Sequence, residues 1–292
     1  MKKSFVFGIA ALIAAGAVAD PAVENVSIEQ DALTHKVTVS YNLTGEDGIV
    51  TVCFLTNDAP FEASKHVVGD VSKVVAVGNG KKIYWQPNLD LGETNLAKYS
   101  IAARVTAWSK SSPPTYYVLN LETKSKRFYE SEDALPLGID SDVYRTKQMV
   151  FRRIYAADNT FKMGSPVAEQ QDSGIISSDN HGCETLHNVT FSKDFYIGVF
   201  EVTQAQWLKI HGEIPNAPKW TQDEWQMQQS FTGDMLPIHN CTRNRWICGE
   251  KHASDSYLGA VDDPSHTTFM SKLRAFAGSG SMYNLPYEAW WE

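Results

Sequence analysis

The chain has 292 residues, of which 43% are hydrophobic and 21% are charged, an ordinary globular composition. This length fits about one to three domains. The net charge of −8 argues against a general nucleic-acid binder, because phosphate binding depends on clustered Lys and Arg side chains. We therefore expect no nucleic-acid partner.

The first 19 residues have the pattern of a secretory signal peptide. Lys2 and Lys3 give a positive start, and Phe5–Val18 is an apolar run. Ala17–Ala19 is a small-x-small cleavage site directly before Asp20. A membrane anchor is the alternative, but the run is short for a span and no charged stop-transfer cluster follows. We expect a periplasmic or secreted protein without a transmembrane segment.

Residues 20–123 alternate between apolar and polar side chains with a period of two. The clearest case is Lys36–Leu43, whose apolar residues share one face: Val37, Val39, Tyr41 and Leu43. The later strands of this stretch are Tyr99–Ala107 and Tyr116–Leu121, the second of which closes the series. Short strands at this spacing, without a long helical pattern, indicate an all-β sandwich of immunoglobulin-like or fibronectin-like type.

Turn chemistry predicts two hairpins inside this domain. Gly45–Gly48 is expected to connect the Lys36–Leu43 strand directly to Ile49–Leu55, since Gly tolerates positive φ and Asp bonds its own backbone. Gly78–Gly80 lies in the same way between Val74–Val77 and Lys82–Trp85. Residues 124–147 then break the pattern. This stretch is dense in charge and carries Pro136 and Gly138, so it is interpreted as a linker that is partly ordered against its neighbours.

A second domain of α+β type is expected over residues 148–292. Its predicted strands are Met149–Ile154, Thr160–Met163, His187–Phe191 and Phe195–Phe200. Thr203 and Gln206 have the form of a capping box, which predicts a helix that ends at Gly212. A second helix is expected from Ser265 to Gly278, with Phe269, Leu273 and Phe276 on one face.

Five segments in this half, in the same order, resemble one family. They are Phe161–Pro166 (FKMGSP), His187–Phe191 (HNVTF), Phe195–Gln204 (FYIGVFEVTQ), Leu236–Ile238 (LPI) and Tyr283–Glu292 (YNLPYEAWWE). They are similar to signatures of the formylglycine-generating enzymes, also called sulfatase-modifying factors, whose fold resembles a C-type lectin. The resemblance implies that residues 148–292 are the N-terminal part of such a domain. Tyr287 and Trp290 depart from the family by standing where a Thr and a Glu cap a helix.

The family oxidises a sulfatase cysteine to formylglycine with oxygen and copper, and it also has calcium-binding loops. The resemblance places the copper-binding cysteine pair and those loops beyond the last matching motif, which reaches Glu292. No catalytic, cofactor-binding or metal-binding residue is therefore assigned. The matching residues are expected to support the fold: Phe195, Tyr196, Ile197 and Val199 in the core, Trp207 as a packing residue, and Glu201 as a buried carboxylate.

Four cysteines follow the signal peptide. Cys53 lies in a strand-like run and is interpreted as a small buried residue. Cys241 and Cys248 are close in sequence and can form a disulfide, because an even count in an exported chain permits pairing. Free thiols are an alternative. Metal binding fits less well, since these cysteines, with Cys183, have no two-residue spacing.

Three functions remain open on the sequence alone. The first is a fragment of a family-type oxidase, which needs a continuation that carries cysteines. The second is a non-catalytic exported protein that binds a protein or glycan through a lectin-like domain. The third is a decayed copy. The unusual residues in the last motif favour the second and third hypotheses over an enzyme active as written.

Overall fold

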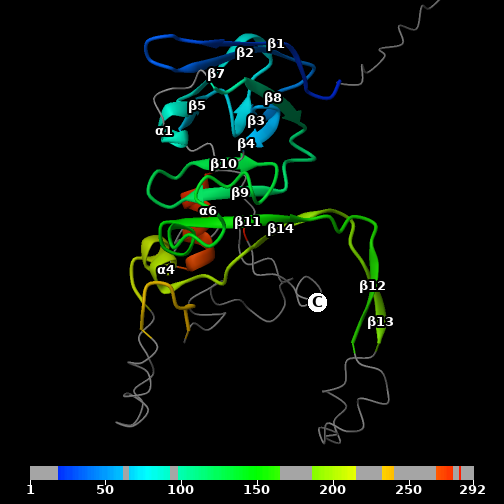
Figure 1. Cartoon of the computed structure of the whole chain (residues 1–292). Helices are drawn as coiled ribbons and strands as arrows, with labels where there is room; N and C mark the ends of the chain where they lie inside the picture. The colour runs from blue at the N-terminus through cyan, green and yellow to red at the C-terminus, as the bar shows by residue number, and fades with distance from the viewer. Residues whose placement is uncertain are drawn as a thin grey trace, which may run out of the picture.

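The protein is described by a computed structural model that covers residues 19–61, 66–92, 98–164, 186–214, 232–239, 268–278 and 283. It is mostly β, with several antiparallel sheets, which confirms the coarse fold expected from the sequence. Figure 1 shows a first unit at the top and a second unit below it, with strand β10 lying between them. Among the described residues, no helix has the length and apolar character needed to cross a bilayer.

The first unit contains two antiparallel sheets. One has the order β1 (Ala22–Gln30), β2 (Val37–Thr44), β7 (Gly78–Trp85) and β5 (Val67–Gly69). In the other, β3 (Gly48–Thr56) pairs with β4 (Ala59–Phe61), β6 (Lys73–Val75) and β8 (Ile101–Trp108). The short helix α1 (Pro87–Leu91) follows β7.

Both sheets bury their inner faces in one core. The alternation predicted for β2 is confirmed, because its four apolar side chains, Val37, Val39, Tyr41 and Leu43, are each no more than 1% exposed. They pack with Val50 and Phe54 of the facing sheet. Phe54 in turn stacks on Trp85, with ring centroids 4.2 Å apart. Alternate side chains of a strand point to opposite faces, so the period of two buries one whole face of β2.

The two predicted hairpins are wrong. β2 pairs with β1 and β7, whereas β3 lies in the other sheet, and β6 and β7 are separated in the same way. Each short connection crosses from one layer to the other, which lets both of its strands bury apolar faces in the shared core. Gly45 makes the first crossing: its φ is +80°, and a Cβ there would lie 2.3 Å from the Asp20 carbonyl oxygen.

The second unit is built on the sheet β10 (Lys126–Tyr129), β9 (Tyr116–Asn120), β11 (Gln148–Ile154) and β14 (Phe195–Gly198), in that order. Beside it, β12 (Thr160–Met163) and β13 (His187–Thr190) form a two-stranded arm that extends away from the sheet (Figure 1). The helices are α2 (Val143–Thr146), α4 (Gln204–His211) and α6 (Phe269–Ala277).

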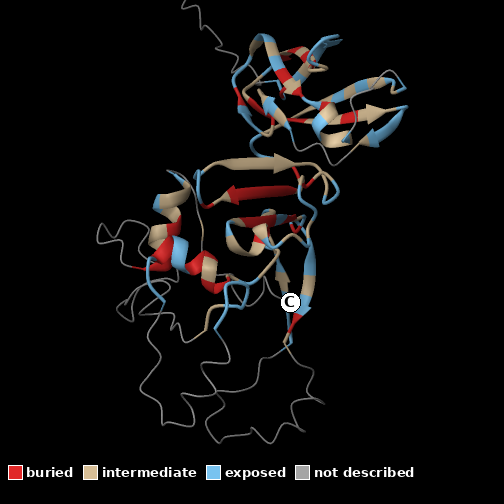
Figure 2. Cartoon of the chain, turned by 60° about the vertical axis from the view of Figure 1, so that its left-hand side comes forward, coloured by how far each residue is buried: buried red, intermediate tan, exposed pale blue. Residues whose placement is uncertain are grey.

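The boundary between the units differs from the expected one. Tyr116–Leu121 was expected to close the first domain, but β9 pairs with β10 and β11 and therefore belongs to the second sheet. The reason is burial on both faces. Tyr117 and Leu119 contact the helical side, while Tyr116 and Val118 pack on Leu135 and Tyr144 on the opposite side. Figure 2 shows β9 as an almost wholly buried strand.

The expected linker, residues 124–147, is part of the second unit rather than a connection between domains. It contains β10, which pairs along its full length with β9, and α2, which packs against β11 and α4. Both sides of β9 need apolar cover, and this segment supplies one of them through Leu135 and Tyr144. The connection between the units is instead the short stretch 109–115, between β8 and β9.

The capping box predicted for α4 is confirmed: Thr203 is the N-cap, Gln206 reaches back to it, and Gly212 ends the helix in the left-handed region. In the second helix, Thr268 is the N-cap and Phe269 the first helical residue, so the expected start at Ser265, which lies outside the described residues, is too early. Trp207 of α4 stacks on Phe269, with ring centroids 4.5 Å apart and planes 6° from parallel.

Candidate functional site

The cysteine pair proposed from the sequence lies outside the described residues. Cys241, Cys248 and Cys183 are all in stretches that the structure does not describe, so their disulfide, thiol or metal state stays a prediction. Cys53 is described, and it is half-buried rather than buried. Alternation explains this, because Val50 and Phe54 of β3 face the core and Cys53 therefore faces outward.

The motif residues of β14 and its following turn are less buried than expected. Phe195, Tyr196, Ile197 and Val199 are half-buried, since β14 is the edge strand of its sheet and β11 is its neighbour. Glu201 is exposed, so the expectation of a buried carboxylate is wrong. It lies after β14, where the chain has left the sheet and turns toward the cap of α4.

The capping residues of the same motif serve the fold. Gln206 Nε2 donates to the carbonyl oxygens of Tyr144 at 2.9 Å and Gln148 at 2.7 Å, while its Oε1 accepts from the Thr203 amide at 3.1 Å. The Thr203 hydroxyl donates to the Arg145 carbonyl at 2.5 Å. These bonds fix the start of α4 against α2 and β11. Trp207 is 1% exposed, which confirms that it is a packing residue.

Within the described part of the chain, no three His, Cys, Asp or Glu side chains come together as a possible ligand group. Copper(I) needs soft thiolate ligands, and calcium needs several oxygen ligands. The described residues therefore fit neither of the ions that the resemblance implies.

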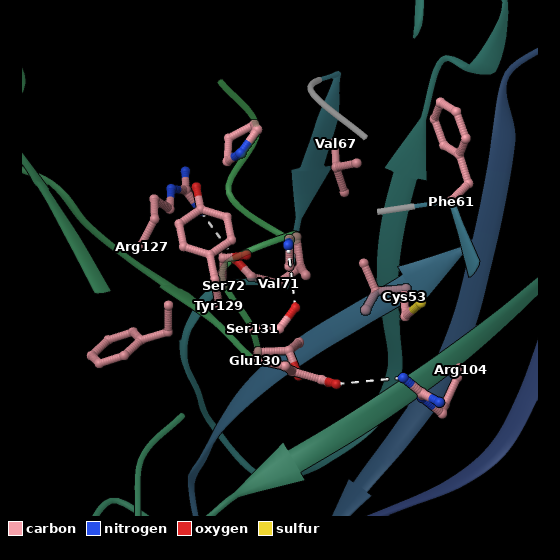
Figure 3. A pocket seen from close by; sticks show the side chains of 15 residues that line it. Cys53, Phe61, Val67, Val71, Ser72, Arg104, Arg127, Tyr129, Glu130 and Ser131 are labelled. Carbon is pink, nitrogen blue, oxygen red and sulfur yellow. Dashed lines mark hydrogen bonds and ion pairs between the residues drawn. The ribbon is translucent and has the colours of Figure 1, made fainter. Parts of the chain in front are cut away.

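A cavity of about 240 Å³ lies at the junction of the two units. One wall comes from the outer side of the first unit, and the other from β10 and the loop after it (Figure 3). The lining residues come from four segments: Thr51–Cys53 with Phe61, Val67 with Val71 and Ser72, Arg104, and finally Arg127–Ser131 with Ala134 and Pro136. Segments far apart in the sequence thus meet in one hollow.

Strand pairing positions the first wall. Cys53 lies directly opposite Arg104 in the β3–β8 ladder, and Thr51 lies two residues before Cys53 on the same face. All three side chains point out of the sheet toward the second unit. The Cys53 thiol donates to the Phe54 carbonyl at 3.6 Å. No histidine is present among the described lining residues.

Backbone contacts hold the second wall against the first. The Phe128 amide of β10 donates to the Ser72 carbonyl at 3.0 Å, and Arg127 Nη1 donates to the Val71 carbonyl at 3.1 Å. Ser72 has a φ of +57°, a left-handed conformation that is uncommon for a residue other than glycine. Its amide donates to Val50 at 2.6 Å, so hydrogen bonds from both units fix it.

A polar chain crosses the junction at the floor of the cavity. Trp108 Nε1 donates to the Thr51 hydroxyl at 2.8 Å, and that hydroxyl donates to Oε1 of Glu130. The other oxygen of Glu130 lies 3.7 Å from Arg104 Nη2. Burial raises the pKa of the Tyr129 phenol, with a smaller raising effect from Tyr144, so it stays protonated at neutral pH.

Comparisons of this chain with protein-family models, with curated proteins and with solved structures find no match. The cavity was not predicted from the sequence either. One signal was available: outward residues of β3 such as Thr51 and Cys53 alternate with core residues, so they had to face something other than the core. What covers that face depends on β10, which the sequence assigned to a linker.

Proposed function

We propose that the chain is an exported, non-catalytic binding protein, and that the cavity at the junction of its units is the binding site. In this proposal the first unit is a sandwich of immunoglobulin-like or fibronectin-like type. The second is a sulfatase-modifying-factor-like unit with a C-type-lectin-like fold. Residues 1–19 support export to the periplasm or the exterior, since they have the pattern of a signal peptide.

The cavity is the observation that carries the proposal. It brings polar and apolar side chains together in one hollow, so a ligand that has both kinds of group could be held there. Its polar groups come from both units: Arg104 from the first, and Arg127 and Tyr129 from the second. A ligand in this position would contact both units at once.

The roles of the motif residues support the same reading. Thr203, Gln206 and Trp207 use their side chains to anchor α4, and none of them lines the cavity. The resemblance to sulfatase-modifying factors, where the structure describes its residues, therefore supports a shared framework. Function is carried by the site and not by the framework.

A fragment screen tests the binding proposal. The chain from residue 20 to residue 292 is screened by ligand-observed NMR with small aromatic and aliphatic fragments of positive, negative and zero charge. Val67 lines the cavity, and Val68 beside it is 59% exposed. Substitution Val67→Phe fills the cavity and should abolish the signals of bound fragments. Substitution Val68→Phe adds the same ring outside and should leave them unchanged.

The proposal fails if no fragment of any charge binds. It also fails if fragments bind equally to the Val67→Phe variant, since that result would place binding elsewhere on the surface. Circular dichroism of both variants shows whether each is folded. If Val67→Phe is unfolded, Ser131→Phe, which fills the cavity from the opposite wall, replaces it as the test variant.

A further inference from the structure

We propose that the junction cavity binds a small amphipathic carboxylate, a ligand with one carboxyl group and a compact apolar body. This inference rests on the proposed binding function and adds the chemical class of the ligand. The hydrogen-bond donors of the lining, its apolar side chains and the size of the cavity each support it.

The charged groups of the lining favour an anion. Among the described lining residues, two guanidinium groups, Arg104 and Arg127, accompany one carboxylate, Glu130. Arg127 uses one N–H on the Val71 carbonyl, and Arg104 makes only a long contact to Glu130. A guanidinium has five donors and no acceptor, so most donors of this pair remain available to an acceptor on a ligand.

Glu130 does not offer the same opportunity to a cation. One of its oxygens accepts from the Thr51 hydroxyl, which is itself held by Trp108 Nε1. Its other oxygen faces Arg104. The carboxylate is therefore a fixed part of the junction that orients Arg104. The groups with unused hydrogen-bonding capacity in the lining are mainly donors, and a carboxylate is the acceptor that matches guanidinium geometry.

Two hydroxyl groups add to this donor set. No hydrogen bond joins the Tyr129 hydroxyl to another described residue, although the residue is half-buried. Figure 3 shows it close to Arg127 on the same wall. Ser72, which belongs to the first unit, lines the cavity as well, in the left-handed conformation that hydrogen bonds from both units hold in place. Such strained residues cluster at ligand sites, where the surrounding structure over-determines them.

The apolar lining residues and the volume of the cavity set the body of the ligand. Phe61, Val67 and Val71 give an apolar surface. The cavity volume of about 240 Å³ lies below the roughly 300–1,000 Å³ of pockets that bind drug-sized ligands, which suits a ligand of about a dozen non-hydrogen atoms. An inorganic anion would leave the apolar side chains uncovered, and a nucleotide is larger than the enclosed volume. An aromatic or branched aliphatic acid matches both the donors and the apolar side chains of the lining.

Calorimetric titration with 3-phenylpropanoate tests the proposal. The uncharged 3-phenylpropanol and the cationic 3-phenylpropylamine have the same ring and chain length, so the three probes differ in the head group. The acid should bind at least about tenfold more tightly than the alcohol, because hydrogen bonds to a charged group contribute the difference. The amine should bind more weakly than the alcohol.

Two variants locate the head group. Tyr129→Phe removes a hydroxyl that bonds no other described residue, and Arg104→Gln removes an exposed guanidinium, so neither should disturb folding. Each should weaken acid binding by about five- to tenfold and leave alcohol binding unchanged. Tyr84→Phe and Arg152→Gln are the matched controls, since neither residue lines the cavity, and they should have no effect.

The outcomes separate this inference from the proposed function. If the alcohol or amine binds the cavity as tightly as the acid, the carboxylate inference is overturned while the binding function survives. If the acid binds but the Tyr129→Phe and Arg104→Gln variants bind it equally well, the assigned head-group contacts are wrong. If no probe binds and the fragment screen is also empty, both proposals fail.

Discussion

Two arginine–carboxylate pairs lie near the junction, and they differ in nearly every respect. Arg153 and Asp194 have side chains only 8% and 20% exposed, and Asp194 Oδ2 accepts from Arg153 Nη2 at 2.7 Å and Nε at 3.0 Å. Arg104 is 62% exposed, and its contact with Glu130 is 3.7 Å long. The first pair is saturated and holds structure together. The second pair leaves most of the Arg104 donors unused. We therefore expect the first pair to stabilise the fold and the second to be available for binding a ligand.

The saturated pair clamps the connection between the units. Arg153 Nη1 donates to the Pro113 carbonyl at 2.5 Å and to the Ser112 hydroxyl at 3.2 Å. Tyr196 on the neighbouring strand donates its hydroxyl to the Pro114 carbonyl. The second sheet thus holds consecutive carbonyls of the 109–115 segment. We therefore expect the loss of Arg153 to lower the free energy of unfolding much more than the loss of Arg104.

The largest effect is expected from Arg153→Met. Removing the guanidinium leaves Asp194 and the Pro113 carbonyl without their partner, and breaking such a pair costs about 3 kcal/mol of unfolding free energy. Urea denaturation of the chain from residue 20 measures it. Arg152→Met on the same strand is the control, because Arg152 is exposed and should change stability by less than about 0.5 kcal/mol. Equal losses of stability in both variants would show that Arg153 does not clamp the connection.

Acid should weaken the clamp next. The Ala157 amide, which donates to Oδ1 at 2.9 Å, lowers the pKa of Asp194 most; partial burial opposes this, and Arg153 lowers the pKa further. A carboxylate whose folded-state pKa is below its ordinary 3.8 stabilises the fold above that pH and loses this contribution as pH falls below it. Melting temperatures between pH 5 and pH 3 should therefore fall less steeply for Asp194→Asn than for the wild type. Parallel curves would contradict the assignment.

A smaller loss is expected from Tyr196→Phe. The variant keeps the ring and removes the hydroxyl bond to Pro114, which costs about 1 kcal/mol. Burial is the main cause that raises the pKa of this phenol, so the bond should persist into alkaline solution. Urea denaturation again gives the number, with Tyr84→Phe as a control in the first unit. A loss no larger than the control would show that Arg153 clamps the connection alone.

The smallest effect on stability is expected from Arg104→Gln, with a change below about 0.5 kcal/mol. An exposed pair at 3.7 Å contributes little, since water screens it and the long side chains lose entropy on pairing. The same variant is expected to bind carboxylates less well. A loss of stability comparable to that of Arg153→Met would show that Arg104 is a structural residue. Both arginine–carboxylate pairs would then stabilise the fold.

The parts of the fold that could be predicted from the sequence are those specified by near neighbours. The alternation in Lys36–Leu43 reports the buried face of β2, and the Thr203–Gln206 spacing reports a helix start, because both depend on geometry within a few residues. The same local patterns do not say which sheet a strand joins. Gly45–Gly48 suits a hairpin and a crossing between layers equally well, and long-range packing selected the crossing.

The candidate site could not be predicted from the sequence, because its residues meet through long-range strand pairing. Cys53 and Arg104 meet through the β3–β8 register, and Tyr129 reaches them because β10 pairs with β9. The apolar run Tyr116–Leu121 has no alternation, since both faces of β9 are covered, and it could be attached to either unit. A prediction that assigns β9 to the first domain also assigns β10 to a linker. It therefore lacks the second wall of the cavity.

The clamp on Pro113 and Pro114 also has a mechanical consequence. Seven residues, 109–115, connect the units covalently, but the carbonyls of these two prolines are fastened to the second sheet by Arg153 and Tyr196. Tension applied between the units would therefore be carried by the hydrogen bonds across the junction and by these side-chain bonds before the proline segment could straighten. The tether that can stretch is shorter than its residue count suggests, and the protein should resist pulling as a stiff spacer up to the force at which this clamp opens.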